Sequence, residues 1–205
     1  MTDLTLRCGC GSVTGLVSGV CRGTGNRVIC YCDDCQAFAR HLGHPERTLD
    51  AHGGTDVVQT SPARVRFGKG ADRLACVRLT PKGVLRWYAS CCSTPIANTA
   101  ASPSLPFVGL FHRCLHDGTD GTPLDQVLGP VRGRVRLKFA TGDTTALRAR
   151  KGSLLPIVLH FVRIMAAAWW RGDQKRSPFF DQRTGQPVAP PRLLSEDERQ
   201  AAYRA

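Results

Sequence analysis

The cysteines of this 205-residue chain constrain its fold more than any other feature, because seven of the ten fall in tight clusters. Zinc takes about four tetrahedral ligands and binds thiolate readily, and cysteines two or three residues apart can reach one ion. The clusters therefore predict that distant parts of the chain converge on zinc and that this convergence ties the sheets together. The clustered residues are Cys8 and Cys10, Cys30, Cys32 and Cys35, and Cys91 and Cys92.

An even number of cysteines also raises the alternative of a disulfide framework. A chain of this length can bury a core without cross-links. Its first residues, MTDLTLRCGC, lack the apolar stretch of a secretory signal, so nothing directs the chain to an oxidising compartment. We therefore expect metal binding in place of disulfides, and a cytoplasmic protein.

The composition is that of a globular protein with a basic balance. Hydrophobic residues make up 42% of the chain, and 28 Lys and Arg against 16 Asp and Glu give a net charge of +12. This charge favours anionic partners such as nucleic acid, acidic lipid or small carboxylate and phosphate ligands, without choosing among them. Nucleic-acid binding is disfavoured, because aromatic residues are sparse and no base-reading helix is evident.

Short apolar runs separated by turn residues predict a mainly β fold. Gly11–Val20 is typical of a strand or tight hairpin, and residues 36–54 of a short helix or loop. Turns at residues 68–70 and 81–83 are short enough for the strands beside them to pair antiparallel, since Pro presets φ and Gly accepts positive φ. The further strands that we expect cover residues 63–67, 73–79, 84–90 and 106–115.

A strictly alternating run at Val131–Phe139 predicts one more strand. Its apolar side chains point one way and its basic side chains the other, which is typical of a half-buried strand. The basic face could bind an anion, although such a face is more often simply solvated. The basic residues are Arg132, Arg134, Arg136 and Lys138.

The most apolar segment of the chain predicts a helix over residues 153–171. Ser153 can cap this helix, and Pro156 is tolerated in its first turn. The segment is too short to span a bilayer and carries His160 and Arg163. We expect the helix to pack on the sheet or to form a homodimer rather than to lie on a membrane, because its charged face is narrow.

The chain changes character at Lys151, where strand-like patterns give way to this helix and a polar, proline-rich tail. We therefore expect a zinc-binding β domain over residues 1–150 and an extension of helix and tail over residues 151–205. The tail ends in a charged segment, SEDERQAAYRA, with helical character.

The middle cluster carries the strongest chemical signal. Its C-x-C-x-x-C spacing supplies three thiolates from six residues, whereas the C-x-C at the start of the chain is weak alone. Three protein ligands with one open position are typical of a catalytic or ligand-binding zinc.

The order of the clusters resembles the glutathione-dependent formaldehyde-activating (GFA) family, which includes the centromere protein V type domain. The resemblance covers roughly residues 4–140 and rests on C-x-C-G at 8–11, C-x-C-x-x-C at 30–35 and a cysteine before the Ser-Thr turn at 93–94. It implies a "β-tent" of antiparallel sheets around two zinc ions, followed here by an additional C-terminal helix. In that family one zinc is structural, and the other is tied to binding or turning over glutathione-type thiol adducts.

The resemblance also implies which cysteines hold which ion. Cys8, Cys10 and Cys92 map to the structural zinc, and the middle cluster of Cys30, Cys32 and Cys35 maps to the second zinc. The family's late pair is usually C-x-x-C, but Ala89 stands here where its first cysteine is expected. Cys91 is the obvious fourth ligand if the chain turns beside it; otherwise it is a buried thiol or reaches toward the second site.

Other candidates are expected to be structural. We interpret His41 and His44 as solvated or capping loop residues. Cys21, Cys76 and Cys114 are isolated, and a lone cysteine is most often a small core residue.

Two functions follow from this interpretation. The first is a carbon–sulfur lyase acting on a glutathione-type or other thiol adduct, with the middle cysteines as metal ligands rather than nucleophiles and no catalytic residue identified. The alternative is a non-catalytic zinc module that binds an acidic partner, either protein or nucleic acid. A fourth protein ligand at the second zinc would favour the module.

Overall fold

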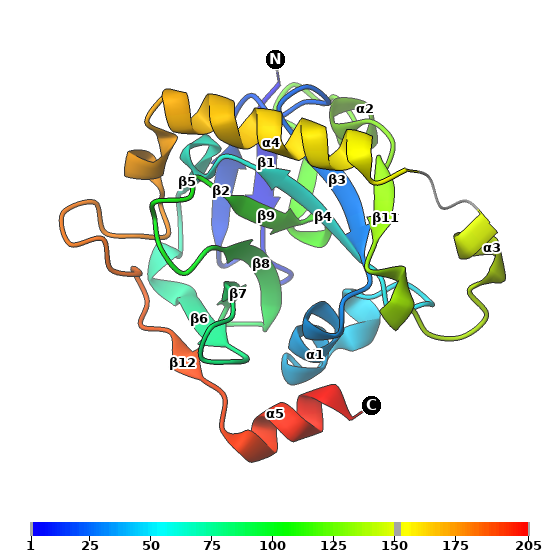
Figure 1. Ribbon diagram of the computed structural model, residues 1–205. Helices are drawn as coiled ribbons and strands as arrows, with labels where there is room; N and C mark the ends of the chain where they lie inside the picture. The colour runs from blue at the N-terminus through cyan, green and yellow to red at the C-terminus, as the bar shows by residue number, and fades with distance from the viewer. Residues whose placement is uncertain (1, 150–152, 205) are drawn as a thin grey trace.

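The computed structural model describes residues 2–149 and 153–204, and in this part of the chain the fold is mainly β with a helix after the sheets (Figure 1). The predicted boundary between residues 150 and 151 lies outside the described residues. The smaller sheet has the order Leu115–Gly118 (β10), Leu4–Arg7 (β1), Thr14–Val17 (β2), Val65–Phe67 (β5). The larger sheet has the order Gly133–Val135 (β11), Asn26–Cys30 (β3), Thr55–Thr60 (β4), Val108–Phe111 (β9), Thr94–Thr99 (β8), Leu85–Ala89 (β7), Leu74–Arg78 (β6), Arg192–Leu193 (β12).

Helices lie at the edges and over one face of these sheets (Figure 1). Short 3₁₀ turns connect several of the strands. The α-helices are Asp33–His41 (α1), Leu124–Leu128 (α2), Thr145–Ala149 (α3), Leu155–Trp170 (α4) and Glu196–Tyr203 (α5).

Both sheets share one hydrophobic core. Trp87 of β7 is fully buried, and its ring lies 5.2 Å from that of Phe179, which follows α4. Phe179 in turn meets Phe67 of β5 edge-on, with the ring centroids 5.5 Å apart. The segment after α4 therefore contributes a central core residue between the two sheets, which its polar composition did not indicate.

The antiparallel pairing predicted across the two short turns is confirmed at residues 81–83 and wrong at residues 68–70. β6 and β7 pair antiparallel across the expected turn at residues 81–83, and β8 extends them to a meander. Gly11–Val20 contains one strand, β2, which forms a hairpin with β1. β5 pairs with β2 and not with β6. The reason lies at Gly70, whose φ of +75° and close approach to Ser12 direct β5 toward the first hairpin, where a Cβ would lie 2.1 Å from the Ser12 carbonyl oxygen.

The nine-residue strand predicted at residues 131–139 is wrong in extent. Only β11 is extended, and it pairs parallel with β3. Arg136 then adopts a left-handed φ of 60°, and residues 137–139 form a 3₁₀ turn. At Gly133 the backbone passes directly beneath Ile157 of α4, so this position is set by helix packing and not by the alternation of side chains.

The predicted C-terminal helix is confirmed as α4, which lies across the outside of the molecule (Figure 1). The prediction that Ser153 caps this helix is wrong: the N-cap is Leu154, which makes no side-chain cap hydrogen bond. Ser153 lies one residue before it and accepts a hydrogen bond from the Leu155 N–H. One stripe of α4 faces the β3–β4 side of the larger sheet, with Phe161 edge-on to Phe107. No helix in the described residues is long and apolar enough to cross a bilayer.

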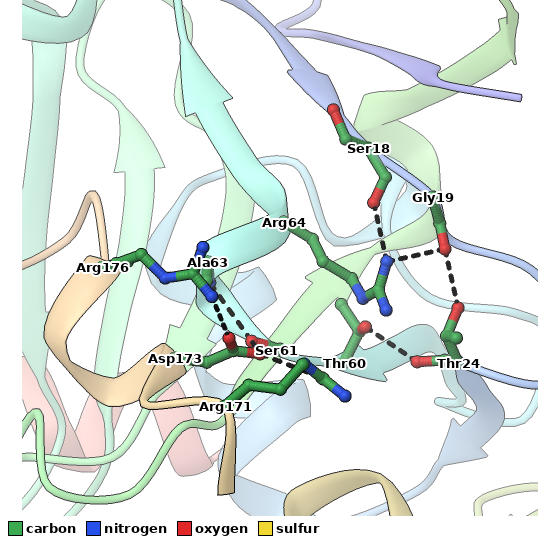
Figure 2. A network of polar contacts seen from close by, with 10 residues as sticks. All are labelled: Ser18, Gly19, Thr24, Thr60, Ser61, Ala63, Arg64, Arg171, Asp173 and Arg176. Carbon is green, nitrogen blue, oxygen red and sulfur yellow. Dashed lines mark hydrogen bonds and ion pairs between the residues drawn. The ribbon is translucent and has the colours of Figure 1, made fainter. Parts of the chain in front are cut away.

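A buried carboxylate anchors the C-terminal end of α4 (Figure 2). Asp173 is almost completely buried, and it accepts hydrogen bonds from Ser61 at 2.8 Å and from Arg171 at 3.0 Å. Arg176 forms a second ion pair with it. Burial opposes ionisation of Asp173, but these hydrogen bonds and charges outweigh it and lower its pKa. The end of α4 is thereby fixed to the chain that follows β4.

Candidate metal centres

The first cysteine cluster joins two hairpins that are far apart in the sequence. Cys8 directly follows β1, and Cys10 lies in the loop to β2, where Gly11 takes a φ of 74° and donates to the Cys8 carbonyl. Cys91 and Cys92 lie in the turn between β7 and β8. A hydrogen bond of 2.9 Å from the Gly9 N–H to the Thr94 hydroxyl holds the two loops together.

The sulfur atoms of these four cysteines are spaced as zinc requires. All four lie within 4.8 Å of one another. The Sγ–Sγ distances are 3.6 Å for Cys8–Cys10, 3.9 Å for Cys8–Cys91, 3.4 Å for Cys10–Cys91 and 3.9 Å for Cys91–Cys92. Four sulfurs about 2.3 Å from a tetrahedral ion are about 3.8 Å apart, whereas a disulfide is close to 2 Å. This cluster could therefore hold a metal ion with a full set of thiolate ligands.

The turn beside Cys91 explains how two adjacent cysteines reach the same side. The Cys92 N–H donates to the Ala89 carbonyl at 3.3 Å, which closes a turn at the end of β7. Ser93 then takes a left-handed φ of 53°, which is uncommon for a residue other than glycine. In an extended strand, adjacent side chains point to opposite faces. Because the chain turns here, Cys91 and Cys92 can point to the same side.

The two exposed thiols of this cluster differ: Cys10 favours the thiolate form, whereas burial and the neighbouring cysteines raise the pKa of Cys91 to about 12. The Sγ of Cys10 lies 3.3 Å from the Oγ of Ser12, and hydrogen bonding by Ser12 lowers the pKa of Cys10 to about 6. Thiolate is the form that binds metal. The backbone and hydroxyl groups of Ser12 thus favour the metal-binding form of Cys10.

The second cluster is built from one strand end and one helix start. Cys30 ends β3, Cys32 is the N-cap of α1, and Cys35 lies in its first turn. The Cys35 and Gln36 N–H groups donate to the Cys32 carbonyl at 3.1 and 3.2 Å, which starts the helix. The three sulfurs lie within 4.8 Å of one another, so this cluster could also hold a metal ion. The positive end of the helix dipole at this position favours thiolates.

A buried arginine lies behind the second cluster. Arg86 of β7 is only 3% exposed, and its Nη1 lies 3.9 Å from the Sγ of Cys35 and 3.4 Å from Oδ1 of Asn98. Its guanidinium also stacks over Phe38 of α1 and forms an ion pair of 3.5 Å with Asp34. The pKa of Cys35 is held well below its usual range, first by the Cys30 and Cys32 thiols and then by the charge of Arg86.

The second cluster has three protein donors. Among the described residues, no fourth His, Cys, Asp or Glu side chain joins this group of sulfurs. The nearby carboxylate of Asp34 is turned to other partners, because it accepts a hydrogen bond from Tyr203 of α5 and pairs with Arg86. α5 packs along α1, and Arg40 also donates to the Ala202 carbonyl at 3.3 Å. The end of the chain thus braces the helix that carries Cys32 and Cys35.

A basic pocket of about 210 Å³ opens beside the first cluster. Cys8, Cys92 and Thr94 line one side of it. Among the described residues that line it there is no carboxylate, although Glu46 lies 3.6 Å from His44 and 3.8 Å from Arg47. The basic lining residues are Arg7, His44, Arg47, Arg113 and His116.

The remaining predicted residues lie outside the two clusters. His41, in the last turn of α1, lies 3.3 Å from a guanidinium nitrogen of Arg192, and His44 lines the basic pocket. Cys76 and Cys114 are buried as predicted. The prediction that Cys21 is a core residue is wrong, because it lies partly exposed in a turn closed by Thr24.

Sequence reasoning missed the residues that support the second cluster. Arg86 stands in a strand whose alternation gives no reason to bury a charge, and its neighbour Trp87 is buried as well. Both faces of β7 are covered, and only the fold reveals this. Tyr203 and Asp34 are 169 residues apart, so nothing local in the sequence connects them.

Comparison with known proteins assigns no activity to this arrangement. The model of a protein family described as a family of unknown function (DUF6151) matches residues 2–191. Among curated proteins, none matches the sequence.

Proposed function

The chain belongs to the family of unknown function DUF6151, and from its two cysteine clusters we propose a zinc protein with one structural and one thiol-binding site. The structural ion is assigned to the four-cysteine cluster, whose sulfur spacing fits a closed tetrahedral site. The thiol-binding ion is assigned to the cluster of Cys30, Cys32 and Cys35. The observation that carries this assignment is the convergence of three cysteine sulfurs without a fourth His, Cys, Asp or Glu among the described residues.

The proposed reaction is the formation or cleavage of a carbon–sulfur adduct, as in GFA-type proteins. A zinc ion at the three-cysteine cluster would stabilise a substrate thiolate at neutral pH and polarise its adduct as a Lewis acid. For glutathione and formaldehyde, the sulfur forms a bond to the carbonyl carbon and the thiol proton passes to the oxygen. The reverse step releases the same two compounds, so no oxidant or reductant is required.

The chain's own residues have positioning roles in this proposal. Three thiolates in one place repel one another, and Arg86 offsets that charge from the buried side. Because its guanidinium also contacts Asn98 and Phe38, Arg86 holds Cys35 against a rigid part of the sheet. The open side of the cluster is left for the sulfur of a ligand.

The first test is metal content. We expect about two zinc ions per chain in the purified protein, and about one in Cys32→Ser. Cys21→Ser is the matched control, since Cys21 is a partly exposed cysteine outside both clusters. A Cys32→Ser protein that retains all of its zinc would show that the site assignment is wrong.

The second test is the reaction. Exchange NMR of glutathione with formaldehyde measures how fast hydroxymethyl-glutathione forms and breaks. We expect the wild type and Cys21→Ser to accelerate the exchange and Cys32→Ser not to do so. A closed fourth protein ligand at this zinc, seen by X-ray absorption, would contradict the enzyme proposal.

The basic pocket favours a second candidate function, a zinc module that binds an acidic ligand or partner. Its five basic side chains lie beside the four-cysteine cluster, and neither Arg86 nor the three-cysteine cluster lines the pocket. Calorimetry with succinate and with inorganic phosphate tests this candidate. We expect binding that Arg113→Gln weakens and Cys32→Ser leaves unchanged, whereas no binding of either anion would exclude a small acidic ligand at this pocket.

A further inference from the structure

α4 presents an apolar face to solvent. Its inner stripe, including Ile164 and Ala168, packs against the rest of the chain. The opposite side repeats apolar residues at spacings of three and four, with Leu155 63% and Trp170 87% exposed. We name this side the outer face of α4; its large exposed residues are Leu155, Val158, Leu159, Val162, Trp169 and Trp170.

The outer face is held outward by contacts on the other side of the helix. The His160 ring lies 3.2 Å from the Gly25 carbonyl, and Phe161 packs on Phe107. At its C-terminal end, Asp173 ties the helix to Ser61 and to the arginines on either side of it (Figure 2). A helix fixed in this way cannot rotate to bury its outer face against its own sheet.

Basic groups border the outer face at both ends. A groove of about 280 Å³ along the C-terminal half is lined by Arg64, Arg163 and Arg171 together with small residues. A second groove, which Leu154 lines at the N-terminal end, carries four further basic side chains. Among the residues that the structure describes, no carboxylate lines either groove, and the sequence of residues 153–171 contains none. The basic side chains of the second groove are Arg134, Arg136, Lys138 and Arg148.

This charge pattern argues against a second copy of the chain as the partner. A two-fold contact between two outer faces would place each basic border against the same kind of border. The described lining residues of the two grooves include no carboxylate that would offset the repulsion between these borders. An anionic surface satisfies both features at once, since it receives the apolar side chains and neutralises the surrounding charge.

We propose that α4 docks the protein on the surface of a bilayer that contains anionic lipid. The outer face enters the interfacial region, where tryptophan side chains are favourable, and the basic border contacts the headgroups. The helix lies parallel to the membrane surface and does not span it. This differs from the packing or dimer role that the sequence favoured, because packing uses only the inner stripe.

The full-length zinc-loaded protein can test this proposal with its own tryptophans. Trp87 is fully buried, whereas Trp169 and Trp170 lie on the outer face, so any fluorescence change on binding reports mainly on α4. The probes are vesicles of phosphatidylcholine alone and vesicles with about one third phosphatidylglycerol. We expect a blue shift and co-sedimentation with the anionic vesicles at least tenfold stronger than with the neutral ones.

Two matched variants separate surface binding from other effects. Leu159→Gln with Val162→Gln makes the outer face polar without touching the core, and we expect it to lose at least tenfold in vesicle binding. Leu105→Gln with Leu193→Gln changes two residues that are each 49% exposed outside α4, and we expect it to bind as wild type does. Unchanged thermal unfolding confirms that both variants fold.

Three results would overturn the proposal. The first is a wild-type protein that does not bind anionic vesicles. The second is equal binding by the Leu159→Gln, Val162→Gln variant. The third is a wild-type dimer in sedimentation velocity that the same variant converts to a monomer while vesicle binding is absent, because the outer face would then contact a second copy.

Discussion

The two cysteine clusters are assembled in opposite ways. The four-cysteine cluster joins loops that are far apart in the sequence, with Cys8 and Cys91 separated by 83 residues. The three-cysteine cluster comes from six consecutive residues, of which Cys32 and Cys35 belong to the start of α1. The first cluster can therefore hold distant strands together. The second can form locally, so it links few segments that are distant in the sequence.

The two clusters also differ in the groups that support them. The four-cysteine cluster is supported mainly by backbone geometry, including the left-handed turn at Ser93 and the bond from Gly9 to Thr94. The three-cysteine cluster is supported by charged side chains, chiefly Arg86. A metal site with four protein ligands, positioned by the backbone, is typical of a structural site. A metal site with an open position and a charged neighbouring side chain is typical of ligand binding.

Loss of the four-cysteine cluster should have the largest effect. We expect Cys8→Ser to lose more than about 5 kcal/mol of folding free energy or to fail to fold, because structural zinc contributes on the order of 10 kcal/mol in small zinc folds. Urea unfolding with zinc analysis measures this effect, and Cys32→Ser is the matched comparison. If both serine variants lost the same stability, the contrast between the two clusters would be wrong.

Removal of the Arg86 guanidinium should affect zinc binding at the three-cysteine cluster and not at the four-cysteine cluster. We expect Arg86→Met to lose about 2 to 3 kcal/mol, because Asn98 and the partly exposed Asp34 lose a charged partner. Zinc should be lost from the three-cysteine cluster alone, and this is measured as zinc per chain after dialysis. Arg78→Met, in the neighbouring strand β6, is the control and should keep both ions; loss of the four-cysteine zinc in Arg86→Met would contradict the assignment.

The parts of the fold that follow from local rules could be predicted from the sequence. The turn at residues 81–83 and the apolar run of α4 specify their own conformations. The C-x-C-x-x-C spacing likewise identified the three-cysteine cluster, whereas the grouping of Cys8 and Cys10 with Cys92 came from the resemblance to the GFA family and Cys91 was left open. The turn, the helix and the three-cysteine cluster each depend on residues close to one another in the sequence.

The parts that the sequence did not reveal depend on contacts between distant segments. An alternating pattern is the same whether a strand lasts three residues or nine, and β11 ends where Arg136 turns out of the sheet. The strand that pairs with β5 is determined by the close approach of Gly70 to Ser12. Secondary-structure propensities of single residues do not contain this information. Arg86 and Tyr203 join the three-cysteine cluster only because β7 and α5 meet α1.

The turn beside Cys91 should be sensitive to the shape of one side chain. We expect Ser93→Val to lose about 1 to 2 kcal/mol and to weaken zinc binding at the four-cysteine cluster, because a β-branched residue resists positive φ. Ser93→Gly is the control and should retain wild-type zinc affinity. Competition with a chromophoric chelator measures the affinity; equal affinity in all three proteins would mean that the backbone there does not position the sulfurs.

The smallest effect should come from the end of the chain. Tyr203→Phe removes the hydroxyl that donates to Asp34, and we expect a loss of about 0.5 to 1 kcal/mol, because this carboxylate is partly exposed. The three-cysteine cluster should bind zinc slightly more weakly, since α5 braces the helix that carries Cys32 and Cys35. Tyr88→Phe, on β7, removes a comparable hydroxyl and serves as the control in the same chelator competition. A larger effect of Tyr203→Phe on the four-cysteine cluster than on the three-cysteine cluster would mean that the two sites are coupled through the core and are not independently supported.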